Sequence, residues 1–346
     1  MNIQSLIRYN IRQLKPYSSA RGEYSGYSKI LLDANENPFD NGMNRYPDPL
    51  QINLKNELAI INGVQPENIF LGNGSDEIID LLIRVFCEPN EDEVMVLPPT
   101  FGMYEVAASL SNIKVKKINL TPEFQPDVDQ ILNEATPQTK ILFLCSPNNP
   151  TGNCFQPRII ENLIKNHIGI VVVDEAYIDF SEYDSVLNWI RKYPNLVVIQ
   201  TFSKAWGLAG IRLGMGFASK EIIEVLNKVK MPYNVNVLTQ KMALEAVQNL
   251  EEKKTQVNEI LIQKAILKKG LVRFEFVEKM YPSDANFFLL KVKNPQKLIH
   301  FLRGKGIIIR DRSKTILCEN CVRISVGTNL ENEQLLRALK LYNSLK

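Results

Sequence analysis

One lysine near the middle of the chain lies where its amine could become reactive. Lys204 stands between Phe202 and Trp206, just after a segment at 196–200 that is too apolar for the protein surface. We expect this lysine to be at least half buried, and burial lowers a lysine pKa because it disfavours the charged form. A neutral amine can attack a carbonyl carbon and hold it as a Schiff base. The stretch by itself favours a commoner arrangement, in which a lysine packs its methylene stem against apolar neighbours.

A glycine-rich turn at 72–77 could bind a phosphate group. It precedes an apolar helical segment, and we expect Ser75 and Asp76 to cap that helix, whose free N–H groups attract anions. The turn is not the dinucleotide-binding fingerprint, since Glu77 stands where the third glycine is required, and no Gly-Lys pair follows as in a nucleotide-binding P-loop. A turn that only caps a structural helix explains the same residues equally well.

Further polar and aromatic residues follow other apolar segments. Phe101 comes after 94–97, Asn149 lies in a proline-rich turn, and Asp174 ends the apolar segment 168–173. A carboxylate at the end of a fully buried strand is costly without a partner, so we expect Asp174 to have a cationic or hydrogen-bonding one. Phe101 and Asn149 also have ordinary interpretations, as a core aromatic residue and a turn residue.

Together these residues supply every group that one kind of ligand requires. The phenol of Tyr177 follows Asp174 closely, and Ser203, Lys204 and Arg212 share one short stretch. A heteroaromatic aldehyde phosphate needs an anchor for its phosphate, a face to stack on, a lysine for its aldehyde and a carboxylate for its ring nitrogen. Pyridoxal 5′-phosphate is the ligand that fits, and the joint occurrence of the motifs indicates it where each motif alone does not.

The elements that must hold these residues alternate between strands and helices. From about residue 65 to 230, short β-rich segments alternate with helical patterns, which predicts an α/β fold with a mostly parallel sheet and helices on both faces. Ligands of such sheets bind at the carboxyl ends of the strands, where the residues above are found. The predicted strands are 69–71, 94–97, 115–118, 141–145, 168–173, 196–200 and 213–218.

The C-terminal part of the chain predicts a small α+β domain. A polar helical region at 236–270 precedes a strand at 286–292, a helix at 295–305, a hairpin at 307–326 and a final helix at 330–345. We therefore divide the chain into an N-terminal arm (1–30), a large cofactor-binding domain (31–245) and a small C-terminal domain (246–346). The arm has apolar residues at helical spacing and is expected to be amphipathic: Ile3, Leu6, Ile7, Ile11 and Leu14.

Composition narrows the class of protein. The 346 residues are 45% apolar and 23% charged, as in ordinary globular proteins, and the net charge is +3, from 41 basic and 38 acidic residues without a basic stripe. We expect neither nucleic acid nor a membrane as partner, since no apolar segment reaches membrane-spanning length. The N-terminal segment lacks the apolar core of a signal peptide, so we expect a cytoplasmic protein.

The chain has five cysteines, an odd number, and they stand in apolar or turn contexts. This pattern is typical of reduced thiols, so we expect a reducing compartment. Cys318 and Cys321 have the spacing of a metal or redox motif, but a zinc site needs a second pair of ligands and the only histidines are His167 and His300. We interpret the two cysteines as flanking a hairpin turn, expect no metal, and leave open whether they ever pair. The few histidines and the lack of a G-x-S-x-G motif also weigh against a hydrolase.

Over nearly its whole length the chain resembles the fold-type I aminotransferases and, among them, the histidinol-phosphate aminotransferases. The succession of SPNNPTG, DEAY and SKAWGLAGIRLG is the most specific part of this resemblance. The matching segments are LLDANENP (31–38), NRYPDP (44–49), GNGSDE (72–77), PPTFGMY (98–104), SPNNPTG (146–152), DEAY (174–177), TFSKAWGLAGIRLG (201–214), IIIRD (307–311) and VRISVG (322–327).

The resemblance implies a role for each candidate residue. Lys204 would bind pyridoxal phosphate covalently, Asp174 would pair with its pyridinium N–H, and Tyr177 with Asn149 would hydrogen-bond its 3-oxygen. Phe101 would stack on the ring; some relatives have tyrosine there, and phenylalanine keeps the stacking face without the hydroxyl. The cofactor phosphate would be held by Ser75, Asp76, Ser203 and Arg212, joined by Tyr46 from the neighbouring subunit of a homodimer. The substrate would be bound by Tyr17, Asn35, Arg310 and Arg323.

The resemblance also implies a reaction. The enzyme would exchange an amino group between L-histidinol phosphate or imidazole-acetol phosphate and 2-oxoglutarate or glutamate, in histidine biosynthesis. Arg310 and Arg323 support an anionic substrate, because each would lie in a strand where an unpaired guanidinium is costly. Aromatic-amino-acid aminotransferases and threonine-phosphate decarboxylases share most cofactor residues. The cofactor motifs leave these alternatives open, together with a cofactor-binding regulator that has no turnover.

Overall fold

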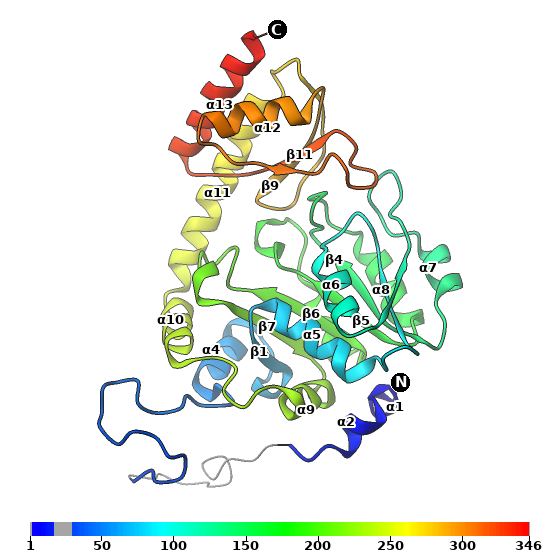
Figure 1. Cartoon of the computed structure of the whole chain (residues 1–346), viewed down its shortest axis with the longest axis vertical. Helices are drawn as coiled ribbons and strands as arrows, with labels where there is room; N and C mark the ends of the chain where they lie inside the picture. Colours follow the sequence, from blue (N-terminus) through cyan, green and yellow to red (C-terminus); the bar gives the residue numbers. More distant parts are fainter. Residues whose placement is uncertain (1, 17–29, 346) are drawn as a thin grey trace.

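Two sheets of different type organise the chain (Figure 1). The computed structural model describes residues 2–16 and 30–345. A seven-stranded sheet with the strand order β1-β7-β6-β5-β4-β2-β3 forms the large part, and a four-stranded sheet with the order β10-β11-β9-β8 forms the small part. The long helix α11 (Leu250–Leu271) runs from the first to the second.

The strands of the large sheet are those that the sequence predicts. They are β1 (Ile69–Asn73), β2 (Glu93–Val96), β3 (Lys114–Lys117), β4 (Thr139–Cys145), β5 (Ile170–Asp174), β6 (Leu196–Thr201) and β7 (Leu213–Ala218). The strands β2 to β6 pair in parallel, while β7 runs antiparallel to both β1 and β6. The mostly parallel sheet is confirmed. β5 begins at Ile170 rather than at Ile168, which is exposed.

Helices cover both faces of this sheet, as expected. One face packs against α5 (Ser75–Phe86), α6 (Met103–Leu110) and α9 (Lys220–Val229). The other face packs against α4 (Ile52–Asn62), α7 (Val128–Glu134), α8 (Pro157–Asn166), α10 (Val237–Gln248) and the 3-10 helix η3 (Val186–Arg191).

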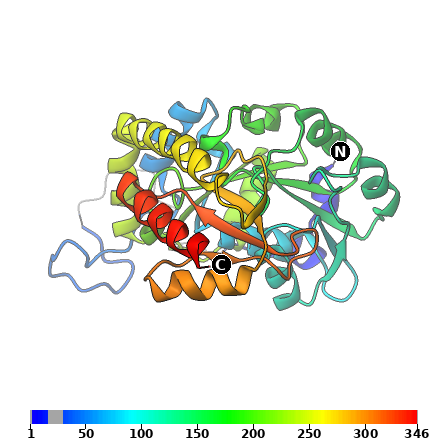
Figure 2. The ribbon, with the colours of Figure 1, turned by 90° about the horizontal axis from the view of Figure 1, so that it is seen from above.

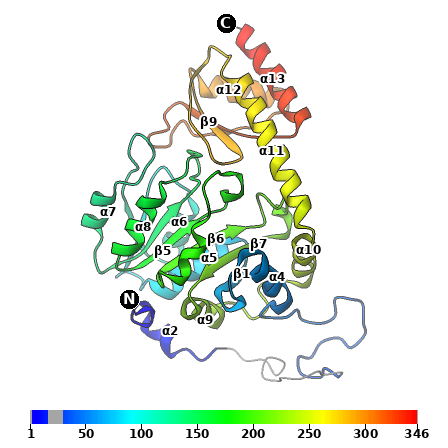
Figure 3. The same ribbon diagram turned by 180° about the vertical axis from the view of Figure 1, so that it is seen from behind.

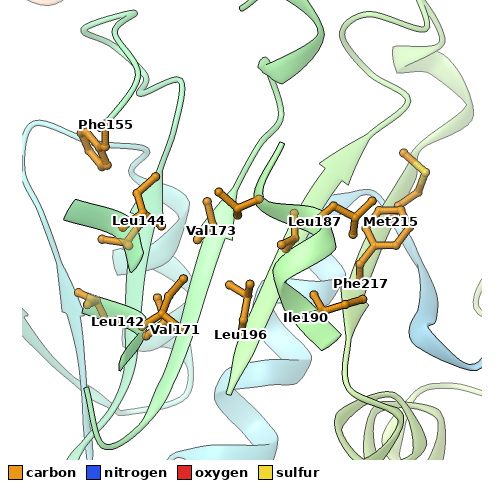
Figure 4. Packing of buried hydrophobic residues seen from close by; sticks show 14 of the residues in the cluster. Leu142, Leu144, Phe155, Val171, Val173, Leu187, Ile190, Leu196, Met215 and Phe217 are labelled. Carbon is orange, nitrogen blue, oxygen red and sulfur yellow. The ribbon is translucent and has the colours of Figure 1, made fainter. Parts of the chain in front are cut away.

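Alternation of side chains along each central strand explains the apolar segments of the sequence. Val171 and Val173 of β5 belong to the core on the η3 side, whereas Ile170 and Val172 belong to the core on the α5 side. A strand that is buried on both faces has an almost continuous apolar sequence. Figure 4 shows the first of these cores, in which side chains of β4 to β7 lie beside those of η3.

The small sheet is antiparallel throughout and forms the expected α+β unit. Its strands are β8 (Val277–Met280), β9 (Phe287–Val292), β10 (Arg310–Asp311) and β11 (Cys321–Ser325). α11, α12 (Pro295–Gly304) and α13 (Asn329–Ser344) pack on it around a core of their own, set beside the large sheet (Figures 2 and 3). β8 is missing from the sequence prediction because this edge strand is only partly buried. The expected domain boundary at 245/246 falls inside α10.

The N-terminal arm is helical but broken in two. α1 (Ile3–Leu6) and α2 (Tyr9–Gln13) are separated at Ile7 and Arg8. Ile3 and Ile7 are buried in the core that contains α5 and α9, and Arg8 forms an ion pair of 2.9 Å with Glu88. Packing of the arm against α5 therefore overrides its helical periodicity. No helix within residues 2–16 and 30–345 has the length and apolar character needed to cross a membrane.

Gly214 of β7 lies against the turn that begins α5. A β-carbon at this position would lie 2.3 Å from the amide nitrogen of Ser75, which belongs to the backbone and cannot give way. We expect Gly214→Ala to lower the free energy of unfolding by about 1–3 kcal/mol, as overpacking does. Urea denaturation followed by circular dichroism measures this. Gly210→Ala is the matched control, because no atom lies within 4 Å of its β-carbon position. Equal stability of the two variants would contradict the close packing.

Candidate active site

The polar residues identified in the sequence gather at one edge of the large sheet. Asp174 is the last residue of β5, and Lys204 follows β6. Because β7 runs antiparallel to β6, it starts at the edge where β6 ends, so Arg212 lies at the same edge as Lys204. The turn after β1 joins them, since Gly74 pairs with Leu213.

Charged groups of this edge and of the small sheet act on the amine of Lys204. They are those of Arg323, Asp174, Arg212 and Asp76. Burial by surrounding protein lowers the pKa of Lys204, the two arginines lower it further, and the two carboxylates oppose the change. A lowered pKa makes the amine a better nucleophile toward a carbonyl group.

Lys204 is more exposed than its apolar neighbours suggest. Phe202 and Trp206 are buried and stack with their ring centroids 4.8 Å apart, but the lysine side chain is exposed. The two rings pack into the core, while Lys204 keeps an exposed part at the edge of the sheet, where the surrounding protein still desolvates its amine. Its ammonium lies 5.5 Å from the centroid of the Tyr177 ring.

Asp174 is buried and has the partner that its position requires. The hydroxyl of Tyr104 donates a hydrogen bond of 2.7 Å to Oδ2, and the amide of Ala176 donates one of 3.1 Å to Oδ1. Burial raises the pKa of the Asp174 carboxyl, and the Tyr104 hydrogen bond lowers it again. The expected hydrogen-bonding partner is thus confirmed, and the carboxylate retains lone pairs for a further donor.

Tyr104 is a residue that the sequence analysis missed. It is fully buried, stacks on Phe143 of β4 at 4.5 Å between centroids, and meets the ring of Phe101 edge-on at 5.5 Å. Burial raises the pKa of its hydroxyl, which therefore stays protonated and donates to Asp174. One signal was available: a tyrosine on the apolar face of a helix needs a partner for its hydroxyl.

A second set of contacts links the large sheet to the small one. Asn149 Nδ2 lies 3.5 Å from the hydroxyl of Tyr177, and Asn149 Oδ1 accepts a hydrogen bond from Arg323 of β11. Arg323 also lies over the ring of Phe287, 5.1 Å from its centroid, and Phe287 packs edge-on against Tyr177. Burial raises the pKa of Tyr177, so its hydroxyl remains available as a donor.

The turn at the start of α5 has the form of an anion site. Gly74, with a φ of +76°, is the N-cap, and no side chain caps the helix. The expectation that Ser75 and Asp76 are caps is therefore wrong: they are the first residues of the helix, because the positive φ of the cap position favours glycine. The first N–H groups of α5 have no capping side chain, and the guanidinium of Arg212 lies beside them, 3.4 Å from Asp76.

These residues fit the groups of pyridoxal phosphate. A β-carbon on Gly74 would lie 2.7 Å from a guanidinium nitrogen of Arg212, so the glycine lets the arginine approach the start of α5 closely. Backbone amides, a guanidinium and the hydroxyl of the half-buried Ser203 are suitable donors for a phosphate. A buried carboxylate suits a cationic ring nitrogen, and the ring of Phe101, half buried beside Tyr104, belongs to the same edge.

Arg310 and Arg323 stand directly opposite each other in the small sheet. Both line a cavity of about 750 Å³. Arg323 is partly buried, as expected, but Arg310 is exposed, so the argument from strand burial does not hold for it, because β10 is a short edge strand. Like charges opposite each other repel, which indicates that an anion belongs near them.

Two of the candidate residues, Asn35 and Tyr46, are not brought to this edge (Figure 1). Tyr17 lies outside the described residues. Asn35 is exposed, and Tyr46 stacks on Tyr233 with ring centroids 4.4 Å apart. Both belong to the segment 30–50, which lies beyond α4 on the side of the large sheet away from the small one (Figure 1).

Comparison with known proteins agrees with this geometry. The family described as aminotransferase class I and II matches residues 22–340. A histidinol-phosphate aminotransferase of Christiangramia forsetii is 52% identical over 341 residues, which are 98% of this chain and 97% of that protein.

Solved structures of histidinol-phosphate aminotransferases have the same fold. That of Clostridium acetobutylicum has a TM-score of 0.80 at 24% identity and covers 87% of this chain and 91% of its own. That of Sinorhizobium meliloti, in complex with pyridoxal 5′-phosphate, has a TM-score of 0.78 at 22% identity and covers 87% and 84%. At these identities the two structures show the fold alone, which is fold type I, and the family follows from the sequence matches. The chain belongs to the class I and II aminotransferases, and among them to the histidinol-phosphate aminotransferases.

Proposed function

We propose that this aminotransferase exchanges the amino group between L-histidinol phosphate or imidazole-acetol phosphate and 2-oxoglutarate or glutamate, in histidine biosynthesis, with pyridoxal 5′-phosphate as cofactor. The observation that carries the proposal is the position of Asp174, Lys204 and Arg212 at one edge of the large sheet, beside the turn that begins α5. The name of the relative at 52% identity supports the choice of substrate.

The cofactor would be held by the residues of the strand edge. Lys204 would bind its aldehyde, Asp174 its ring nitrogen, and Asn149 with Tyr177 its ring oxygen. Asn149 Oδ1 is occupied by Arg323, which leaves the amide nitrogen to donate. The cofactor phosphate would be held by the N–H groups of Ser75 and Asp76 at the start of α5, with Ser203 and Arg212, and Phe101 would cover the ring.

Pyridoxal phosphate supplies an electron sink for the pair released when the Cα–H bond of the substrate breaks. Asp174 would support this chemistry by balancing a positive charge at the ring nitrogen, and the hydrogen bond from Tyr104 favours its ionised form against the effect of burial. Lys204 Nζ would take the proton from the substrate Cα and deliver it to a different carbon, because returning it to Cα would regenerate the substrate. Its lowered pKa favours the neutral amine that this step needs.

The small sheet would bind the anionic end of the substrate through Arg310 and Arg323. A phosphate monoester offers more acceptor oxygens than a carboxylate and suits forked arginine contacts. Glutamate would use the same arginines through its carboxylates. An aromatic-amino-acid aminotransferase and a threonine-phosphate decarboxylase remain the alternative functions. Tyr17 and Asn35 are further candidates for substrate binding in the proposed function and in both alternatives.

We also propose a cytoplasmic homodimer in which Tyr46 of one subunit completes the phosphate site of the other. Large apolar side chains of the segment 30–50 are exposed, as a subunit interface requires: Ile30, Leu32, Phe39, Met43, Tyr46 and Leu50. All five cysteines are free and buried, which suits a reducing compartment.

The covalent role of Lys204 predicts the behaviour of one variant. Lys204→Ala should lose transamination and should no longer retain cofactor after borohydride reduction, as measured by the mass of the intact protein. Lys264→Met is the matched control, since burial also lowers the pKa of Lys264 but its amine binds the carbonyl oxygen of Ser283. Reductive trapping of cofactor in the Lys204→Ala protein would assign the role to another lysine.

Sharing of Tyr46 predicts complementation between two damaged proteins. Mixed dimers of Lys204→Ala and Tyr46→Phe chains contain one site with both changes and one site with neither. After denaturation and refolding together, the mixture should be more active than the mean of the two parents refolded separately. Activity equal to that mean would show that each subunit uses its own Tyr46.

The choice of substrate predicts a selective loss. Arg310→Gln should lower kcat/KM for histidinol phosphate by about tenfold, since an exposed charged hydrogen bond is worth less than the roughly 1.5–3 kcal/mol of a buried one. Unphosphorylated histidinol should be hardly affected. Steady-state kinetics measures both. Equal loss for both compounds, or a wild-type enzyme that prefers phenylalanine or decarboxylates threonine phosphate, would overturn the assignment.

A further inference from the structure

Arg312 lies on the same face of the small sheet as the two arginines already described. Arg310 pairs with Arg323, Asp311 pairs with Val322, and the amide of Arg312 continues the ladder by donating a hydrogen bond of 3.0 Å to the carbonyl of Cys321. Since side chains alternate along a strand, Arg310 and Arg312 share one face, and Asp311 belongs to the other.

The arginine face is the one turned toward the large sheet. Cys321 and Leu289 belong to the large core, whereas Val322 and Ile324 belong to the separate core of the small unit. On the far face, Asp311 is occupied by Gln296 of α12, at 2.7 Å. The carboxylate of Asp311 therefore lies on the opposite face of the sheet and does not neutralise the three arginines.

Arg312 lacks the partner that a half-buried guanidinium needs. Its Nε is buried and has no hydrogen-bond partner. Within residues 2–16 and 30–345, no carboxylate lies within ion-pair distance of Arg310, Arg312 or Arg323. Four neighbouring groups affect the pKa of Arg312. Arg323 and Arg310 lower it, whereas Cys318 and Tyr177 raise it.

Burial lowers the pKa of Arg312, and the charges of Arg323 and Arg310 lower it further. Three mutually repelling cations without a carboxylate are unfavourable unless an anion joins them, and a buried donor without a partner adds to this cost. A dianion with three free oxygens matches three guanidiniums better than a carboxylate with two.

We infer that Arg312 is a third substrate-binding arginine, which contacts the phosphate of a phosphate-monoester substrate and selects it over a carboxylate. The inference rests on the proposed function and deepens it. Glutamate has one fewer charge and fewer acceptor oxygens at the same place, so Arg310 and Arg323 suffice for it. Arg312 therefore strengthens binding of the phosphate-monoester substrate and does not affect binding of glutamate.

The test compares two arginine variants of the cofactor-loaded protein. Arg312→Gln should raise KM for histidinol phosphate by about tenfold or more and leave KM for glutamate within about twofold. It should also weaken binding of inorganic phosphate, measured by isothermal titration calorimetry, by a similar factor. Arg273→Gln, an exposed arginine that follows α11, is the matched control and should change neither quantity.

Arg312→Lys separates binding from a purely structural role. Lysine keeps the positive charge but lacks the forked guanidinium, so this variant should bind phosphate more tightly than Arg312→Gln and less tightly than the wild type. Equal loss for both substrates, or phosphate binding unchanged in Arg312→Gln, would overturn the inference. If Arg312→Gln does not fold, as judged by circular dichroism, unchanged phosphate affinity in Arg312→Lys would overturn it instead. A wild-type enzyme that does not turn over histidinol phosphate would refute the proposed function, while the phosphate titration would still decide the role of Arg312.

Discussion

The burial of one carboxylate governs the arrangement of the site. Asp174 ends β5 between two neighbouring strands, with 3% of its surface exposed, so water contributes little to its charged form. Desolvation alone would favour the protonated carboxyl, which could not balance a cationic ring. The hydroxyl of Tyr104 opposes this effect, and the stacking of its ring on Phe143 holds it in position. The charge at the centre of the site thus depends on an aromatic pair in the core.

The direction of a single strand brings the remaining groups to Asp174. A parallel β7 would need a crossover from β6 and would begin at the opposite edge of the sheet. Because β7 is antiparallel, the short connection from β6 carries both Lys204 and Arg212 at one edge. The two glycines at this edge have complementary roles: Gly214 lets β7 approach the backbone of α5, and Gly74 lets the guanidinium of Arg212 approach the start of the same helix.

The large sheet could be predicted from the sequence because strands buried on both faces have continuous apolar segments, and Asp174 was identifiable as the residue after one of them. Tyr104 could not be identified in this way, because its partner Asp174 is 70 residues away in the sequence and only the packing of α6 brings the two side chains together. Arg312 required the register of β10 against β11, which fixes the faces of that sheet. The capping role assigned to Ser75 failed because backbone conformation, rather than side-chain type, decided that Gly74 is the cap.

The position of β1 also has a consequence for how the protein folds. β1 ends the large sheet and pairs there with β7, while Asn234 reaches back to Glu77, 157 residues earlier, to hold the turn that follows β1. Contacts across so much chain carry a large loop-closure entropy and form after the local ones. We therefore expect the phosphate turn to be completed late in folding, so that a chain with an unfinished sheet has no place to load the cofactor. Since binding to the native state alone stabilises that state by mass action, cofactor supply favours those chains that have already closed their sheet.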